Sequence, residues 1–181
     1  QSEKETDTTI RFNSDGKLKI LHCSDIHLDA PFFGMTSEKS DERRRELRST
    51  FMRMMEFVRE RAIDYCLIAG DLFDTAYATN TTAEILIREF RNCPKTKFII
   101  APGRHDCYEN NAIYLSGRLP ANCYVFSSDT LSRFDFDEDK VTVYGWGFVT
   151  DEMVENRFNI EVALVTSTDL GVKKGEIMES V

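Results

Sequence analysis

Short apolar runs alternate with amphipathic stretches along the N-terminal part of the chain. The apolar runs lie within residues 18–27, 64–74 and 96–106, and each is about one strand long. Between the first two runs, residues 38–62 repeat apolar side chains at helical spacings of three and four, at Leu47, Phe51, Met54, Val58 and Ala62. Acidic residues near the start of this stretch and arginines near its end suit the helix dipole. The pattern predicts three strands, with a long helix between the first and the second.

A second helix is predicted between the second and third apolar runs. Asn80 or Thr81 could cap its start, and one of its faces carries Ala83, Leu86, Ile87 and Phe90. Further strands are predicted at residues 123–128, 141–148 and 160–167. Alternating strands and helices followed by a run of strands predict an α/β layered fold, with parallel strands first and more sheet later.

The length of the chain bounds its domain organisation. With 181 residues it is long enough for one well-cored domain and too short for two comfortable ones. Residues 1–16 are polar and are predicted to be a frayed or edge segment, so the single domain is assigned to residues 17–181. Because the chain ends soon after its last predicted strand, we expect the domain to be short on its C-terminal side.

Composition narrows the functional classes. A net charge of −8 argues against a generally basic nucleic-acid surface, although metal ions can supply positive charge at a local phosphate site. No run of 18 apolar residues is present, so no membrane span is expected. The five cysteines form no CxxC pair, which favours a reduced, cytoplasmic protein.

Acidic and imidazole side chains follow each of the first three predicted strands. They are Asp25 and His27, then Asp71 and Asp74, then His105 and Asp106. The carboxyl ends of parallel strands meet at one edge of a sheet, and mixed carboxylate and imidazole ligands suit manganese, iron or zinc. Gly70 and Gly103 let the backbone turn sharply after its strand. Each motif alone is more often a polar turn, whereas all three in order predict a common metal site.

The stretches "HCSDIHLDAPF", "AGDLFD" and "APGRHD" resemble the first three motifs of the calcineurin-like metallophosphoesterase superfamily. The first two are most similar to the SbcD-type DNA repair exonuclease branch. The resemblance covers about residues 18–170. It implies a four-layer α/β/β/α sandwich with a two-metal site, usually of manganese. It also implies that Asp25 and His27 hold the first metal, that Asp71 bridges both metals, and that Asp74 orients a ligand or the loop.

The resemblance further implies a catalytic acid. His105 would protonate or steady the leaving group, and Asp106 would orient His105. The chemistry of such a site is in-line displacement at phosphorus, with two cations about 3.5–4 Å apart.

Arg104 departs from the family pattern. The third motif of the family reads GNHD, and its asparagine ligates the second metal, whereas arginine has no lone pair and cannot be a ligand. We expect Arg104 to stand in for the second cation by pairing with Asp71, and its guanidinium fork is equally suited to clamping a phosphate. The alternative is that Arg104 points to solvent and that its loop is merely structural.

Later ligand motifs of the family also have no counterpart in the chain. Thr166, Ser167 and Thr168 stand where the family has a ligand histidine, and the chain stops before any GHxH pair. None of its three histidines, His22, His27 and His105, remains for those places. By this analogy the first metal keeps three of its four protein ligands and the second keeps only Asp71, so one ion or none is expected.

Two functional classes stay open. The first is a metal-dependent phosphodiesterase, by resemblance a DNA exonuclease, which in this branch usually works with an SMC-like ATPase subunit. The second is a catalytically impaired relative that binds a phosphate ligand, a nucleic acid or a protein partner. The arginine-rich residues 41–48 could touch a phosphate backbone, although a solvated helix face is the favoured interpretation.

Overall fold

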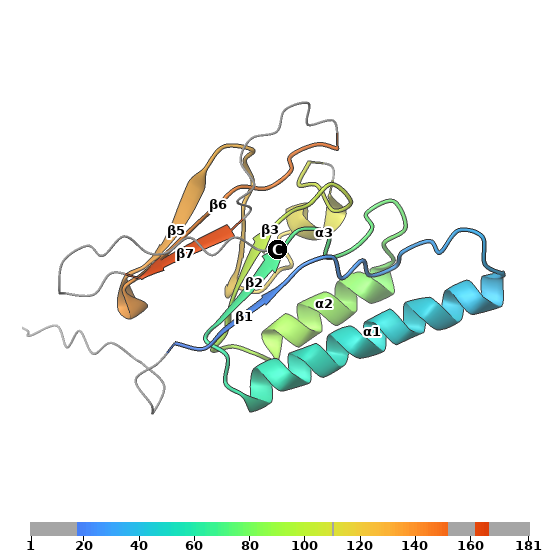
Figure 1. The fold of residues 1–181 in the computed structure, drawn as a ribbon, viewed down its shortest axis with the longest axis horizontal. Coiled ribbons are helices and arrows are strands. Elements are labelled where there is room, and N and C mark those ends of the chain that lie inside the picture. The colour runs from blue at the N-terminus through green and yellow to red at the C-terminus, as the bar shows by residue number, and fades with distance from the viewer. Residues whose placement is uncertain (1–17, 110, 152–161, 167–181) are drawn as a thin grey trace, which may run out of the picture.

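The computed structural model of the chain describes residues 18–109, 111–151 and 162–166. Two helices, a parallel sheet and an antiparallel sheet are stacked as three layers in these residues (Figure 1). The predicted polar segment 1–16 and the predicted shortening after the last strand concern parts of the chain outside the described residues.

The central sheet contains four parallel strands in the order β1-β2-β3-β4. They are β1 (Ile20–Cys23), β2 (Tyr65–Ala69), β3 (Lys97–Ala101) and β4 (Cys123–Val125). The first three lie in the predicted apolar runs and are parallel, as predicted. Every residue of β2 is buried, which is typical of a parallel strand covered on both faces.

Helices α1 (Ser37–Glu60) and α2 (Asn80–Arg91) cover one face of the parallel sheet (Figure 1). Phe51, Met55 and Val58 form the buried stripe of α1, whereas Leu47 and Met54 are only partly buried against the core. The prediction for Ala62 was wrong, because α1 ends at Glu60 and Ala62 is exposed in a left-handed turn with φ of 48°. Of the helices that the structure describes, none combines the length and the apolar character needed to span a bilayer.

Thr79 caps α2, and this corrects the prediction of Asn80 or Thr81. The Thr79 hydroxyl accepts the backbone N–H of Thr82 at 3.2 Å. The predicted apolar face is confirmed by the burial of Ala83, Leu86, Ile87 and Phe90.

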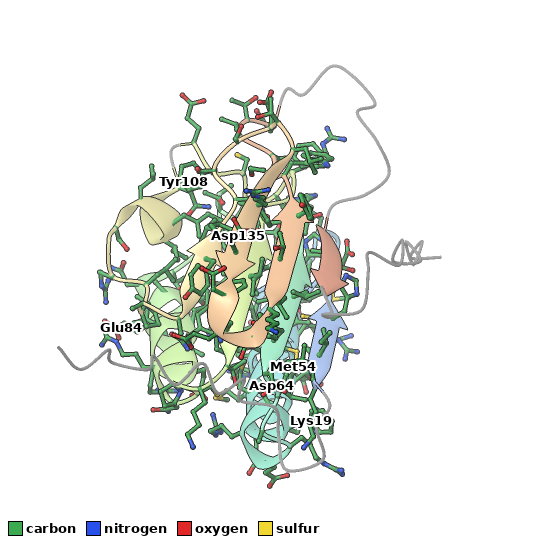
Figure 2. The ribbon with its side chains drawn as sticks, turned by 90° about the vertical axis from the view of Figure 1, so that its left-hand side faces the viewer. Lys19, Met54, Asp64, Glu84, Tyr108 and Asp135 are labelled. Atoms are coloured by element: carbon green, nitrogen blue, oxygen red, sulfur yellow. The ribbon has the colours of Figure 1, made fainter. Side chains whose placement is uncertain are left out.

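A second, antiparallel sheet has the order β5-β6-β7. Its strands are β5 (Ser132–Phe136), β6 (Val141–Gly145) and β7 (Val162–Thr166). β6 and β7 lie within two predicted strands, but β5 was not predicted. Its alternation of Phe134 and Phe136 with polar residues was an available signal. Figure 2 looks onto this sheet, with Asp135 of β5 labelled and the parallel sheet behind it.

The parallel sheet separates two hydrophobic cores. Side chains alternate between its faces, so that Cys66, Ile68, Phe98 and Ile100 pack with the helices, whereas Tyr65, Leu67, Ile99 and Ala101 pack with the second sheet. The described residues therefore supply the first three layers of the predicted α/β/β/α sandwich.

The carboxyl ends of β1, β2 and β3 point to one end of the molecule. Lys19 and Asp64, which precede β1 and β2, are labelled at the lower end of Figure 2, and Tyr108 of the loop after β3 is labelled near its upper end. The short helix α3 (Ala112–Leu115) follows that loop. The three polar motifs consequently lie together at the upper end.

Candidate metal centre

The loops after β1 and β2 hold three candidate ligands in an unusual backbone conformation. Asp25, His27 and Asp71 have φ values of 53°, 49° and 54°, a left-handed region that non-glycine residues seldom occupy. Such residues cost on the order of 1–3 kcal/mol each and persist where the surrounding structure fixes them. The backbone N–H of Asp25 donates to Gly70 O at 3.1 Å, and that of His27 donates to Asp71 O at 2.9 Å. The two loops are thus locked to each other at the predicted site.

The side chains of these three residues converge. His27 Nε2 lies 3.8 Å from Asp25 Oδ1 and 3.9 Å from Asp71 Oδ2, and one ligand atom from each residue lies within 4.8 Å of the others. Two atoms that each lie about 2.2 Å from one ion can be up to about 4.4 Å apart, so the two separations from His27 Nε2, of 3.8 and 3.9 Å, suit a shared divalent cation. Two carboxylate oxygens and one imidazole nitrogen match the predicted donor set.

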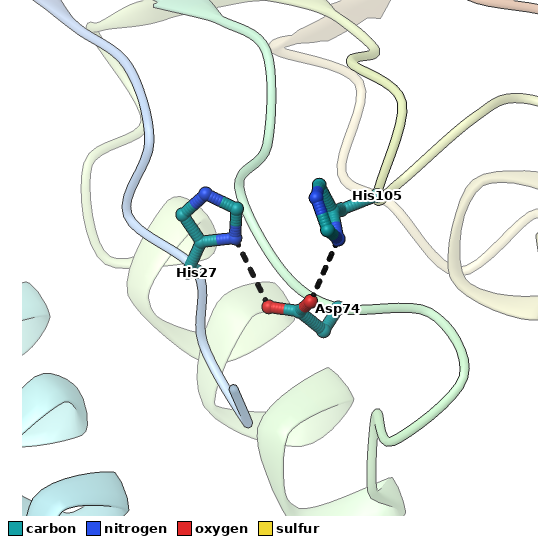
Figure 3. A group of neighbouring side chains, drawn as sticks. All are labelled: His27, Asp74 and His105. Atoms are coloured by element: carbon teal, nitrogen blue, oxygen red, sulfur yellow. Dashed lines mark hydrogen bonds and ion pairs between the residues drawn. The ribbon is translucent and has the colours of Figure 1, made fainter. Parts of the chain in front are cut away.

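Asp74 connects the two histidines of the site, as Figure 3 shows. Its Oδ2 lies 3.1 Å from Nδ1 of His27, its Oδ1 lies 2.9 Å from Nδ1 of His105, and the two rings meet edge to face at 4.9 Å. A histidine that donates from Nδ1 presents the lone pair of Nε2, which here faces Asp25 and Asp71. Asp74 therefore contacts the rings of both His27 and His105, and its role in orienting a metal ligand stays a prediction.

Asp106 is a buried hub beneath the site. Its carboxylate accepts backbone N–H groups of Asp71, Leu72 and Gly103 at 3.0, 3.0 and 2.6 Å, and the hydroxyl of Tyr114 at 2.6 Å. Burial raises the pKa of Asp106, and the hydrogen bonds from Tyr114, Gly103 and Leu72 act in the opposite direction. The hub joins the loop after β2 to the loop after β3.

The prediction that Asp106 orients His105 was wrong. The Asp106 carboxylate is fully buried and is occupied by the loop backbone and Tyr114, whereas Asp74 contacts the His105 ring. The carbonyl of His105 also accepts the N–H of Thr75 at 2.9 Å. His105 is therefore held by the loop after β2, and its side chain remains more than half exposed to incoming ligands.

The two glycines of the motifs have different physical roles. Gly70 has φ of 84° and makes the predicted sharp turn. Gly103 is required for close packing instead, since a Cβ atom there would lie 2.4 Å from Asp71 Oδ1 and 2.5 Å from Asp71 N. This approach lets the N–H of His105 donate to Asp71 Oδ1 at 2.8 Å.

Arg104 does not form the predicted pair with Asp71. Its side chain is exposed, and no hydrogen bond or ion pair joins it to another residue that the structure describes. Asp71 instead uses one oxygen for the His105 N–H and turns the other toward His27. Of the residues at the position of the later ligand histidine, Thr166 ends β7, and Ser167 and Thr168 lie outside the described part of the chain.

Two supporting residues were missed by sequence reasoning. Asn111 is fully buried, caps α3 and donates from Nδ2 to the carbonyls of Asp106 and Cys107 at 3.2 Å each. Tyr114 reaches Asp106 from the same helix. An asparagine before a short apolar stretch is a cap signal, but no sequence pattern shows which carbonyls its amide reaches.

A family model described as calcineurin-like phosphoesterase matches residues 18–170, a range that contains all of the converging residues. The chain belongs to this family. The mixed α/β fold, with its parallel sheet and helices, agrees with that membership, so the calcineurin-like phosphoesterase fold predicted from the motifs is confirmed.

Two curated relatives are similar in sequence to this chain over different shares of its length. "Uncharacterized metallophosphoesterase YhaO" of Bacillus subtilis (strain 168) is 28% identical over 154 residues, which are 77% of this chain and 36% of YhaO. "DNA double-strand break repair protein Mre11" of Sulfurisphaera tokodaii is 30% identical over 92 residues, 50% of this chain and 22% of that protein. The chain thus matches about a third or less of the length of these relatives.

Proposed function

We propose that this domain is a metal-dependent phosphoesterase whose site holds one divalent ion, most suitably Mn²⁺, at Asp25, His27 and Asp71. The observation that carries the proposal is the convergence of three ligand atoms within 4.8 Å of one another. The orientation of His27 by Asp74 supports it, because a neutral imidazole with a free Nε2 is the form that binds metals.

The protein groups around the ion have separate tasks in this proposal. An ion held there would polarise a phosphoryl oxygen and lower the pKa of a bound water. Asp74 holds the exposed ring of His105, which donates a proton to the leaving oxygen of the ester. Because Asp25, Asp71 and Asp74 make the hollow negative, an anionic phosphate ester is repelled unless a cation is present.

The proposed substrate is a nucleic-acid phosphodiester, and the proposed activity is that of a DNA exonuclease. The similarity to Mre11, whose name describes DNA double-strand break repair, supports this choice over a small metabolite. The SMC-like ATPase partner stays a prediction. All five cysteines are free, which supports the proposed location in the reducing cytoplasm.

A binding module without catalysis is the second candidate. The exposed Arg104 favours it, because a guanidinium beside His105 supplies a donor fork for phosphate where the family pattern has a metal ligand. In this candidate the site binds phosphate-bearing ligands and releases them unchanged.

Hydrolysis of bis-p-nitrophenyl phosphate with and without Mn²⁺ distinguishes the two candidates. We expect the wild-type protein to bind one Mn²⁺ by isothermal titration calorimetry and to turn over the ester. Asp71→Ala should lower both by roughly 100-fold, since it removes a ligand. Turnover unaffected by Asp71→Ala would refute the proposed metal site.

The variant Arg104→Asn separates the remaining outcomes. Turnover gained only in Arg104→Asn would mean that the arginine blocks catalysis. One Mn²⁺ bound without turnover in either protein would favour the binding module. Anomalous scattering from a manganese-soaked crystal should show a single ion between Asp25, His27 and Asp71.

A further inference from the structure

A groove of about 440 Å³ lies between α1 and the loop before α2. Its walls include Arg44, Arg45 and Arg48 of α1 and, on the opposite side, Tyr77. The volume is within the range of about 300–1,000 Å³ typical of ligand pockets. We call these four residues and the space between them the arginine groove.

The carboxylate at the floor of the arginine groove is already satisfied. Asp29 is buried, and its oxygens accept from the Arg48 guanidinium and from the N–H and hydroxyl of Thr79, the latter two at 2.9 and 3.1 Å. Asp29 and Arg48 therefore neutralise each other inside the wall. The net charge that the groove presents to solvent therefore depends on Asp41, Arg44 and Arg45.

That remaining charge is positive. Arg44 pairs at 2.6 Å with Asp41, a second carboxylate that lines the groove, so the uncompensated positive charge of the lining is that of Arg45. Arg45 is exposed, and no hydrogen bond or ion pair joins it to another described residue. In a chain with a net charge of −8, this local excess of arginine fits a phosphate group, whose oxygens match the guanidinium fork.

An exposed aromatic pair continues the arginine groove. Phe33 is 82% exposed and Tyr77 is 47% exposed, and their rings meet edge to face at 6.2 Å. A single exposed aromatic residue is ordinary, but two in contact beside arginines form a platform on which an unstacked base can lie.

The arginine groove adjoins the metal centre through short connections. Asp29 follows His27 by two residues, and the N–H of Ala30 donates to His27 O at 3.1 Å. On the other side of the groove, Tyr77 follows Asp74 by three residues, and its N–H donates to Asp74 O at 2.9 Å. The loops that carry the site residues thus also carry the aromatic pair.

We propose that the arginine groove and Phe33 together bind single-stranded nucleic acid, with phosphates on the arginines and a base on the aromatic pair. Exposed aromatic faces favour a single strand, because the bases of a duplex are already stacked. The bound strand would place a neighbouring phosphodiester at the metal centre, a role that rests on the proposed function. Binding itself needs no metal.

Fluorescence anisotropy of a labelled oligothymidylate in EDTA tests this proposal. We expect Arg45→Glu and Phe33→Ala each to weaken binding by roughly 10-fold, and Arg45→Glu also to flatten the dependence of affinity on salt. Arg53→Glu and Phe57→Ala are matched controls on α1, exposed and outside the groove, and should bind as the wild type does. Circular dichroism checks that all four variants are folded.

Several results would overturn the inference. They are no binding by the wild type, equal losses in the control variants, or equal affinity for a duplex of the same sequence. Equal affinity for polyglutamate would also overturn it, because the groove would then be a general anion surface. A protein that hydrolyses bis-p-nitrophenyl phosphate but fails to bind the oligonucleotide keeps the proposed function and loses this inference. A protein that binds the oligonucleotide but does not hydrolyse bis-p-nitrophenyl phosphate keeps this inference and loses the proposed function.

Discussion

One carboxylate, Asp74, orients both imidazole rings of the site. Its Oδ2 is hydrogen-bonded to His27 and its Oδ1 lies 2.9 Å from Nδ1 of His105, so turning either ring would lose a contact with the carboxylate. The proposed ligand His27 and the proposed acid His105 are consequently coupled through one carboxylate.

Asp74→Asn should therefore weaken Mn²⁺ binding by roughly 10- to 100-fold, because the amide has a single acceptor oxygen for two ring N–H groups. Isothermal titration calorimetry measures the effect. Asp135→Asn, an exposed carboxylate on β5, is the control and should bind Mn²⁺ normally. An Asp74→Asn protein with wild-type affinity would show that Asp74 does not set the orientation of His27.

Gly103→Ala should destabilise the fold by about 1–3 kcal/mol and also weaken Mn²⁺ binding, since its Cβ collides with the backbone and side chain of Asp71. Urea denaturation and calorimetry measure the two effects. In the control Gly117→Ala the new Cβ meets nothing within 4 Å, so only the strain of its φ of 66° remains. Loss of Mn²⁺ affinity in that control would argue against a local cause.

The convergence of the three proposed ligands could be predicted from the sequence because they follow apolar runs directly. Asp25, His27 and Asp71 need only the rule that parallel strands end at one edge. The contacts of Asp106 and Arg104 could not be predicted, because they depend on how two loops approach each other. An aspartate next to a histidine in sequence turned out to face away from it.

At the scale of elements, Asp29 ties the first site loop to both helices. It accepts from Arg48 of α1 and from Thr79 at the start of α2. The helices therefore hold the loop that carries His27, in addition to covering the sheet.

Thr79→Ala should cost about 0.5–2 kcal/mol of stability, because it removes the cap of α2 and one hydrogen bond to Asp29. Thr81→Ala makes the same chemical change two residues later at an exposed position and should be nearly neutral. Urea denaturation of both proteins is the measurement. A larger loss for Thr81→Ala would restore the original prediction of the cap.

The periodicity of apolar residues predicted the ends of α1 and the short strand β5 less well than it predicted the long elements. The apolar spacing carries the α1 pattern on to Ala62, but the backbone turns after Glu60 to bring Ile63 into the core. β5 was missed because its short alternation includes two charged residues, Arg133 and Asp135, which suit a strand with one solvent face.

At the scale of the molecule, the layered packing determines how the cysteines react. Cys66 and Cys93 are buried among the helices and the sheet, and burial raises the pKa of Cys123 to about 12, from an ordinary value of 9.0. Because the unfolded chain releases this proton first, the contribution of Cys123 to stability falls as the pH rises above about 9.

Iodoacetamide at pH 9 should therefore label Cys66 and Cys93 of the folded protein only as fast as the fold opens, and should label the partly exposed Cys123 slowly. At this pH about one in a thousand Cys123 thiols is ionised, given its pKa of about 12. Mass spectrometry follows the labelling, and urea-unfolded protein is the reference in which all five cysteines react. Rapid labelling of Cys123 without urea would contradict the packing described here.

The buried hub at Asp106 has a consequence for how the site tolerates substitution at position 104. It fixes the two loops through backbone amides, so their shape is largely indifferent to which side chain occupies the neighbouring exposed position 104. A different side chain at position 104 can therefore be accommodated without rebuilding the two loops. An exchange there would change the charge beside His105 and leave the domain folded.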